Sequence, residues 1–139
     1  MSSALEGIRV VDLTTVGPGA HCTRILADLG ADVVRIVEAR PVIEERGRRQ
    51  WKAPTWAYGM RRNTRPLGLD LKNERGLEVF FKLLEKADVL MVGLRPSAAE
   101  RLGVHYDAVS RANPRVIYCS VTGFGVDGTY RDIAGHDIN

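Results

Sequence analysis

The sequence has little of what marks membrane, secreted or low-complexity proteins. Its 139 residues contain two cysteines, six prolines and 6% aromatic residues. No apolar run approaches the roughly 18–20 residues that cross a bilayer. The N-terminus shows no basic stretch followed by an apolar segment, which a secretory signal would need. We therefore expect no membrane span and a cytoplasmic protein, or one of an organellar matrix.

Cysteine and histidine are too sparse for a disulfide scaffold or a metal centre. Cys22 and Cys119 are expected to be buried free thiols in a reducing compartment. The two cysteines and three histidines show no metal-ligand spacing, so we expect no metal. There is also no Walker loop and no nucleophile elbow.

What is present is the composition of an ordinary globular domain, with 45% hydrophobic and 27% charged residues. The net charge of +3 is uneven, because residues 40–65 carry +6 and the rest of the chain −3. This basic stretch lies in an excursion, 38–65, that lacks clean periodicity. It suits a solvated loop, a site for a small polyanion, or a nucleic-acid patch. The chain shows no recognised nucleic-acid module, so we expect no nucleic-acid partner.

Apolar periodicity outside this excursion alternates between strands and helices. The predicted strands are 8–13, 31–37, 67–71, 88–92 and 115–121. The predicted helices are 20–29, 74–86, 96–102 and 106–112, with a little local helix around 56–61. The alternation predicts one α/β domain over 1–139, built on an open, mostly parallel sheet of Rossmann type.

The turn after the first strand contains Gly17-Pro18-Gly19, and Glu38 follows the second strand. This order mimics a dinucleotide-binding fingerprint, but the match is poor. Cys22 stands where the third glycine belongs, and Pro18 lacks an N–H. A glycine turn at a helix start is the simpler interpretation. A helix start at the carboxyl ends of strands still suits an anion or a carbonyl oxygen.

His136 is the histidine with a setting that suits chemistry. It follows a glycine-rich stretch and precedes Asp137, and an unperturbed imidazole with a pKa of about 6.5 transfers protons near neutrality. A lone histidine is also often structural, and the residues alone leave both roles open. His21 and His105 are interpreted as structural.

Taken together, segments along nearly the whole chain resemble one family, the class III CoA-transferases and α-methylacyl-CoA racemases. The similar segments are Leu5–Leu13, Gly30–Ile36, Leu69–Lys72, Ala87–Leu90, Arg95-Pro96, Arg101–Gly103, Asn113–Tyr118, Gly123–Gly125 and Gly135–Asn139. The resemblance implies a Rossmann-like, CoA-binding N-terminal portion of a larger fold in which two chains interlock as a homodimer. Since family members are much longer, we expect a fragment that is inactive alone.

The resemblance also implies the substrate contacts. The partner would be an acyl-CoA thioester, with no cofactor beyond its CoA moiety. Val16, Gly17 and Pro18 would line the thioester and pantetheine. The residues expected around adenosine and the phosphates are Leu69, Lys72, Gly93, Leu94, Arg95 and Arg101. Arg40 would stack on adenine, although it is displaced by about a residue from the family pattern.

The ending Gly135–Asn139 is similar to the racemase branch, where the histidine is one of two catalytic bases. The resemblance thus makes His136 a proton-transfer residue, with Asp137 beside it to orient it or to lie near the oxyanion. The implied reaction epimerises 2-methylacyl-CoA thioesters through an enolate. The alternatives are a CoA-transferase acting between carboxylic acids and a non-catalytic CoA-binding fragment.

Overall fold

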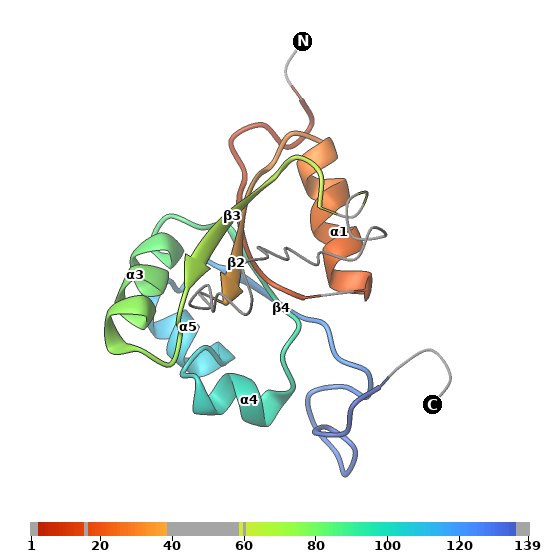
Figure 1. The fold of residues 1–139 in the computed structure, drawn as a ribbon, viewed down its shortest axis with the longest axis vertical. Helices are drawn as coiled ribbons and strands as arrows, with labels where there is room; N and C mark the ends of the chain where they lie inside the picture. The colour runs from red at the N-terminus through yellow and green to blue at the C-terminus, as the bar shows by residue number, and fades with distance from the viewer. Residues whose placement is uncertain (1–2, 16, 39–58, 60, 136–139) are drawn as a thin grey trace, which may run out of the picture.

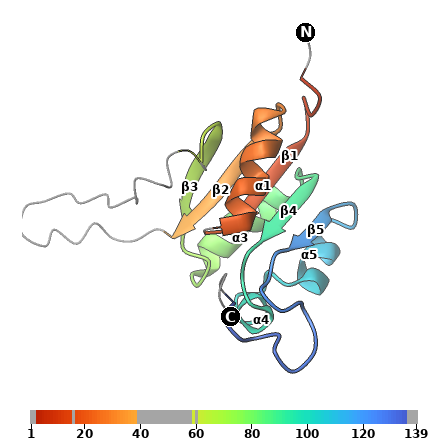
Figure 2. The ribbon, with the colours of Figure 1, turned by 90° about the vertical axis from the view of Figure 1, so that its right-hand side faces the viewer.

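The computed structural model describes residues 3–15, 17–38, 59 and 61–135. Figure 1 shows the fold, and Figure 2 labels all five of its strands. They form one open sheet in the order β3-β2-β1-β4-β5, and every neighbouring pair is parallel. The strands are β1 (Arg9–Leu13), β2 (Asp32–Glu38), β3 (Thr64–Leu69), β4 (Val89–Val92) and β5 (Ile117–Ser120). The predicted parallel, Rossmann-like sheet is confirmed.

The helices cover the two faces of the sheet unequally. In Figure 2, α1 (Gly17–Asp28) lies on one face, and α3 (Glu74–Leu84) and α5 (Tyr106–Ala112) lie on the other. The short α4 (Pro96–Arg101) lies beyond the carboxyl ends of the strands. The larger core cluster packs under α3, α4 and α5, around side chains such as Phe80 and Leu84 that are fully buried.

The connection from β3 into α3 is fixed by local chemistry. Asn73 caps α3, as the sequence predicts, because its side-chain oxygen accepts a hydrogen bond from the Arg75 N–H at 3.0 Å. Gly76, in the first turn, lies so close to the Asp70 carbonyl that a Cβ there would collide with it. The turn that carries Lys72 is therefore packed directly against the start of α3.

The prediction of which face α1 buries is wrong. The predicted apolar face of this helix included Cys22, Ile25 and Leu29, but all three are exposed. The buried residues of α1 are instead small, and they are Gly19, Ala20, Thr23 and Ala27. Small side chains let the helix axis approach the sheet closely, so the stripe that faces the sheet is not the most apolar one. The expectation of two buried thiols is wrong for Cys22, whereas Cys119 is half-buried.

The third strand begins three residues before the predicted start, because Thr64, Arg65 and Pro66 pair in register with Val33, Val34 and Arg35 of β2. Part of the basic excursion is thus strand. The predicted local helix at 56–61 falls almost wholly outside the described residues. No helix in the described part of the chain is both long enough and apolar enough to span a membrane.

Candidate functional site

The sheet order places β1 and β4 side by side while their connections lead to different helices. Such a switch point, at the carboxyl ends of parallel strands, is where open α/β sheets bind ligands. Here Thr14 follows β1 and Gly93 follows β4, and a Cβ on Gly93 would lie 3.2 Å from the Thr14 Cα. Glycine therefore lets the two connections meet. Gly17 and Pro18 begin α1 at the same edge.

A buried aspartate holds the β1–α1 connection in place. Asp12 is fully buried; its Oδ1 accepts a hydrogen bond from the Thr14 N–H at 2.7 Å, and its Oδ2 accepts one from the Thr23 hydroxyl at 2.9 Å. Asp12 is paired in register with Arg35 on β2. Burial, together with the positive charge of the nearby Arg61, lowers the pKa of the Arg35 guanidinium. The turn that leads to Gly17 is therefore anchored by two hydrogen bonds inside the core.

Two residues that are predicted to contact the phosphates of CoA, and that are far apart in sequence, lie close together at this edge. Lys72 follows β3 and Arg101 ends α4, and both line one cavity of about 340 Å³. Its other lining residues are Leu71, Asn73, Glu74, Leu77 and Leu102. Both cations are exposed, and neither forms an ion pair with any described residue. Two cations and one carboxylate beside leucine side chains suit a phosphorylated ligand with apolar parts.

A larger cavity of about 470 Å³ lies beside the β4–α4 connection, and among the described predicted site residues Leu94 alone lines it. Leu94 and His105 line it together with Tyr106 and Tyr118. The Nδ1 of His105 is buried and has no hydrogen-bond partner among the described residues. Burial raises the pKa of Tyr118, whose hydroxyl donates to the Val104 carbonyl at 3.3 Å. The only local signal for this cavity in the sequence is the pair His105-Tyr106, and it is a weak one.

Some of the remaining predicted site residues are described by the structure, and the others lie outside its described part. Leu69 ends β3 and packs against the main core cluster, as Leu94 does. Arg95 precedes α4, and its Nη1 donates to the Asp132 carbonyl oxygen at 3.2 Å. The residues that lie outside the described part of the chain are Val16, Arg40, His136 and Asp137.

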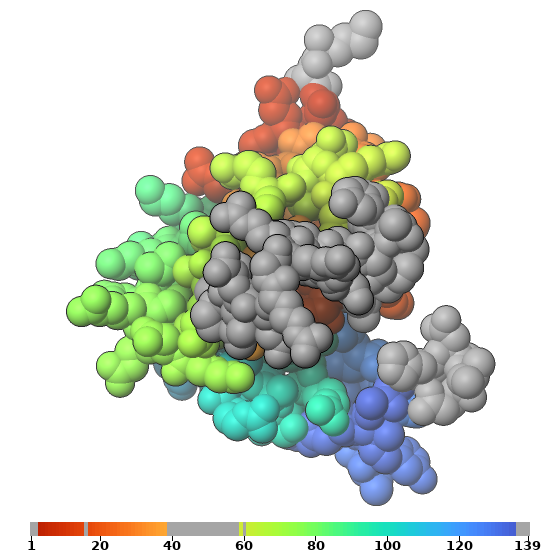
Figure 3. All heavy atoms as spheres, viewed as in Figure 1, coloured from red at the N-terminus to blue at the C-terminus, as the bar shows by residue number. Residues whose placement is uncertain are grey.

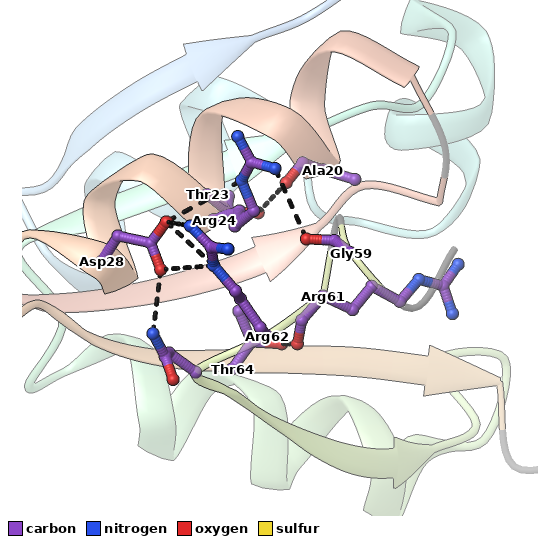
Figure 4. A network of polar contacts seen from close by, with 9 residues as sticks. Ala20, Thr23, Arg24, Asp28, Gly59, Arg61, Arg62 and Thr64 are labelled. Atoms are coloured by element: carbon purple, nitrogen blue, oxygen red, sulfur yellow. Dashed lines mark hydrogen bonds and ion pairs between the residues drawn. The ribbon is translucent and has the colours of Figure 1, made fainter. Parts of the chain in front are cut away.

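The described part of the basic excursion is used for internal contacts. Arg62 Nη2 lies 2.6 Å from Asp28 Oδ2, in an ion pair that Figure 4 draws. The hydrogen bond from Arg62 is the main reason why the pKa of Asp28 is lowered. Arg65 pairs with Asp32 at the amino end of β2, also at 2.6 Å. Arg61 donates to the Thr15 carbonyl at 2.8 Å. Arg62 and Arg65 are thus each paired with a carboxylate of this chain. A polyanion site over residues 40–65 stays a prediction, because most of that stretch lies outside the described residues.

Metal binding has no support among the residues that the structure describes. Within those ranges, no group of three or more histidine, cysteine, aspartate or glutamate side chains is placed to hold an ion.

The comparisons with known proteins agree with one another. Residues 5–139 match the model of CoA-transferase family III. The chain is 37% identical to a formyl-CoA:oxalate CoA-transferase from Streptomyces avermitilis, over 99% of this chain and 34% of that protein. It is 38% identical to the α-methylacyl-CoA racemase of Homo sapiens, over 98% of this chain and 32% of that protein.

A solved structure of a CAIB/BAIF family protein from Brucella suis superposes with a TM-score of 0.85 at 30% identity. The match covers 99% of this chain and 38% of that one. The chain therefore spans about a third of the length of the relatives that it matches. The family model covers all but the first four residues, and the parallel sheet agrees with it. This chain belongs to CoA-transferase family III.

Proposed function

We propose that this chain binds the CoA moiety of an acyl-CoA thioester at the carboxyl edge of its sheet. The observation that carries the proposal is the cavity lined by both Lys72 and Arg101, whose charges no described carboxylate pairs. CoA carries a diphosphate and a 3′-phosphate, and charge-assisted hydrogen bonds to such groups are among the stronger polar contacts in proteins. The leucines of the same cavity would lie against the apolar parts of the ligand.

The other contacts in the proposal follow the family resemblance. Arg40 would stack on adenine, and Leu69, Gly93, Leu94 and Arg95 would lie around the adenosine and phosphates. Val16, Gly17 and Pro18 would line the pantetheine and thioester. The described members of these sets lie at the end of β3 and after β1 and β4, at one edge of the sheet, which is consistent with one extended ligand crossing it.

For the reaction, we propose epimerisation of a 2-methylacyl-CoA. A thioester makes its α-C–H acidic because the enolate places charge on the carbonyl oxygen. Inversion needs a base on each face of that carbon. The racemase-like ending makes His136 one of these bases, with Asp137 orienting it or lying near the oxyanion. The second base would come from a region of the enzyme beyond these 139 residues.

A second candidate reaction is CoA transfer between carboxylic acids. The sequence identity supports it as well as it supports the racemase: the chain is 37% identical to a formyl-CoA:oxalate CoA-transferase and 38% identical to an α-methylacyl-CoA racemase. A third candidate is CoA binding without catalysis. We also propose that the enzyme is a homodimer without a metal, acting in the cytoplasm or an organellar matrix.

Titration of CoA into the protein by calorimetry tests the binding proposal. The chain should bind CoA, and Lys72→Gln with Arg101→Gln should weaken binding. An absence of CoA binding by the wild-type protein overturns the proposal.

The reaction is tested with the complete gene product and a 2-methylacyl-CoA in heavy water. Deuterium should enter the α-position, and His136→Ala should abolish this incorporation. Transfer of CoA to an added labelled carboxylic acid, without α-deuteration, would instead select the transferase.

A further inference from the structure

The loop after β5, residues 123–135, closes on itself at its base. A Cβ on Gly123 would lie 2.8 Å from the Gly135 Cα, and a Cβ on Gly135 would lie 2.9 Å from the Gly123 Cα. Only glycine fits both positions of this backbone contact. We call residues 123–135 the glycine loop. Its last residue, Gly135, directly precedes His136 in the sequence.

Asp132 joins the glycine loop to the start of α4. Its Oδ1 accepts a hydrogen bond from the Ser97 N–H at 2.9 Å, and its own carbonyl accepts one from Arg95 Nη1 at 3.2 Å. Arg95 occupies the N-cap position of α4, and its side chain makes no capping hydrogen bond. Asp132 therefore supplies, from 35 residues further along the chain, the acceptor that a local N-cap would normally supply.

A second contact holds the loop to the same helix. Arg131 Nη2 lies 2.7 Å from Glu100 Oε1 on the last turn of α4, and its Nε lies 3.3 Å from Asp132 Oδ2. Figures 1 and 2 both place the glycine loop alongside α4, and the space-filling view in Figure 3 shows the two segments adjoining. Arg131 and Asp132 thus attach the glycine loop to the first turn and to the last turn of α4.

This attachment relates two parts of the proposed site. The residue after Glu100 is Arg101, which lines the proposed CoA cavity. We propose that Asp132 is a positioning residue: it fixes Gly135, and so the point from which His136 departs, relative to α4 and its CoA contact. The inference rests on the proposed function. It adds a role for Asp132, which does not touch the substrate in this scheme.

Steady-state kinetics of α-deuterium incorporation by the complete gene product test the role. Asp132→Ala removes the acceptor and should lower kcat about tenfold, because a displacement of about 1 Å at a reacting group costs up to ~100-fold in rate. KM for the acyl-CoA should change less than kcat, since the substitution leaves the side chains of Lys72, Arg95 and Arg101 in place and keeps the Asp132 carbonyl that accepts from Arg95. Asp132→Asn keeps Oδ1 as an acceptor for the Ser97 N–H and should restore most of kcat.

Asp127→Ala is the matched control. Asp127 is exposed in the same loop and forms no hydrogen bond or ion pair with any described residue. This variant should match the wild type in kcat and KM. A purely structural role for Asp132 would lower the melting temperature while leaving kcat of the folded enzyme unchanged.

An Asp132→Ala enzyme with wild-type kcat overturns the inference, as does a loss confined to KM. If this variant does not fold, Asp132→Glu tests the inference instead, because it keeps the negative charge but lengthens the side chain by one methylene. A kcat below half that of the wild type then supports positioning, and an unchanged kcat overturns it. A wild-type enzyme that binds no acyl-CoA overturns the proposed function itself, a result that no variant of Asp132 can produce.

Discussion

The two edges of the sheet use their cations differently. At the amino edge, Arg62 and Arg65 each lie 2.6 Å from a carboxylate of this chain, on Asp28 and Asp32. At the carboxyl edge, Lys72 and Arg101 line a cavity and pair with no described carboxylate. Exposed ion pairs contribute little to stability, whereas unpaired cations around a cavity are available to a ligand. Among the described cations, the pairing state therefore distinguishes the proposed ligand contacts from the internal ion pairs.

The largest expected effect is on ligand binding at the carboxyl edge. Lys72→Gln and Arg101→Gln should each weaken CoA binding about 10-fold or more, since a hydrogen bond to a charged group contributes about 1.5–3 kcal/mol. Arg65→Gln at the amino edge is the matched control and should leave the dissociation constant unchanged. Calorimetry checks all three variants. Equal losses at both edges would remove the distinction between them.

The next effect concerns the backbone that carries Lys72. Gly76→Ala should destabilise the fold by about 1–3 kcal/mol, because the new Cβ meets the Asp70 carbonyl and overpacking costs that much. The displaced turn should also weaken CoA binding, although no charge is removed. Urea unfolding and a CoA titration measure the two consequences. An unchanged urea midpoint would show that the turn accommodates a methyl group.

A smaller effect is expected from the amino edge. A double-mutant cycle with Arg65→Gln and Asp32→Asn should give a coupling of about 0.2–1 kcal/mol, because both side chains are at least half exposed. The coupling should shrink further as salt is added. Urea unfolding of the four proteins measures it. A coupling well above this range would make the pair a principal support of β3.

The smallest effect is a dependence on acid pH. The Arg62 hydrogen bond lowers the pKa of Asp28, and the Ser97 N–H does the same for Asp132. Because the unfolded carboxyls titrate near their ordinary value of about 3.9, both contributions are fully present above that pH. They are lost as the pH falls through the lowered folded values. Urea midpoints of wild type and Asp28→Asn should therefore converge at acid pH, and a constant gap would contradict this.

The strands and most helices could be predicted because their signals are local. Asn73 before an amphipathic stretch predicts the start of α3, and the structure begins it there. The face that α1 buries could not be predicted in this way. It depends on the approach of the helix to Asp12 and the sheet, which favours Gly19, Ala20 and Thr23 over larger apolar residues.

For the site, the sequence and its family resemblance singled out Lys72 and Arg101 but did not show that they share a cavity. The contacts of Asp132 left no local signal, because its donors, Ser97 on α4 and Arg95 just before α4, lie more than thirty residues away. Fold class, family and candidate contacts are thus determined by the sequence, since they follow from periodicity, turn residues and similarity. Only the tertiary structure decided which cations are neutralised and which face a cavity, because pairing depends on distances between residues that are remote in the chain.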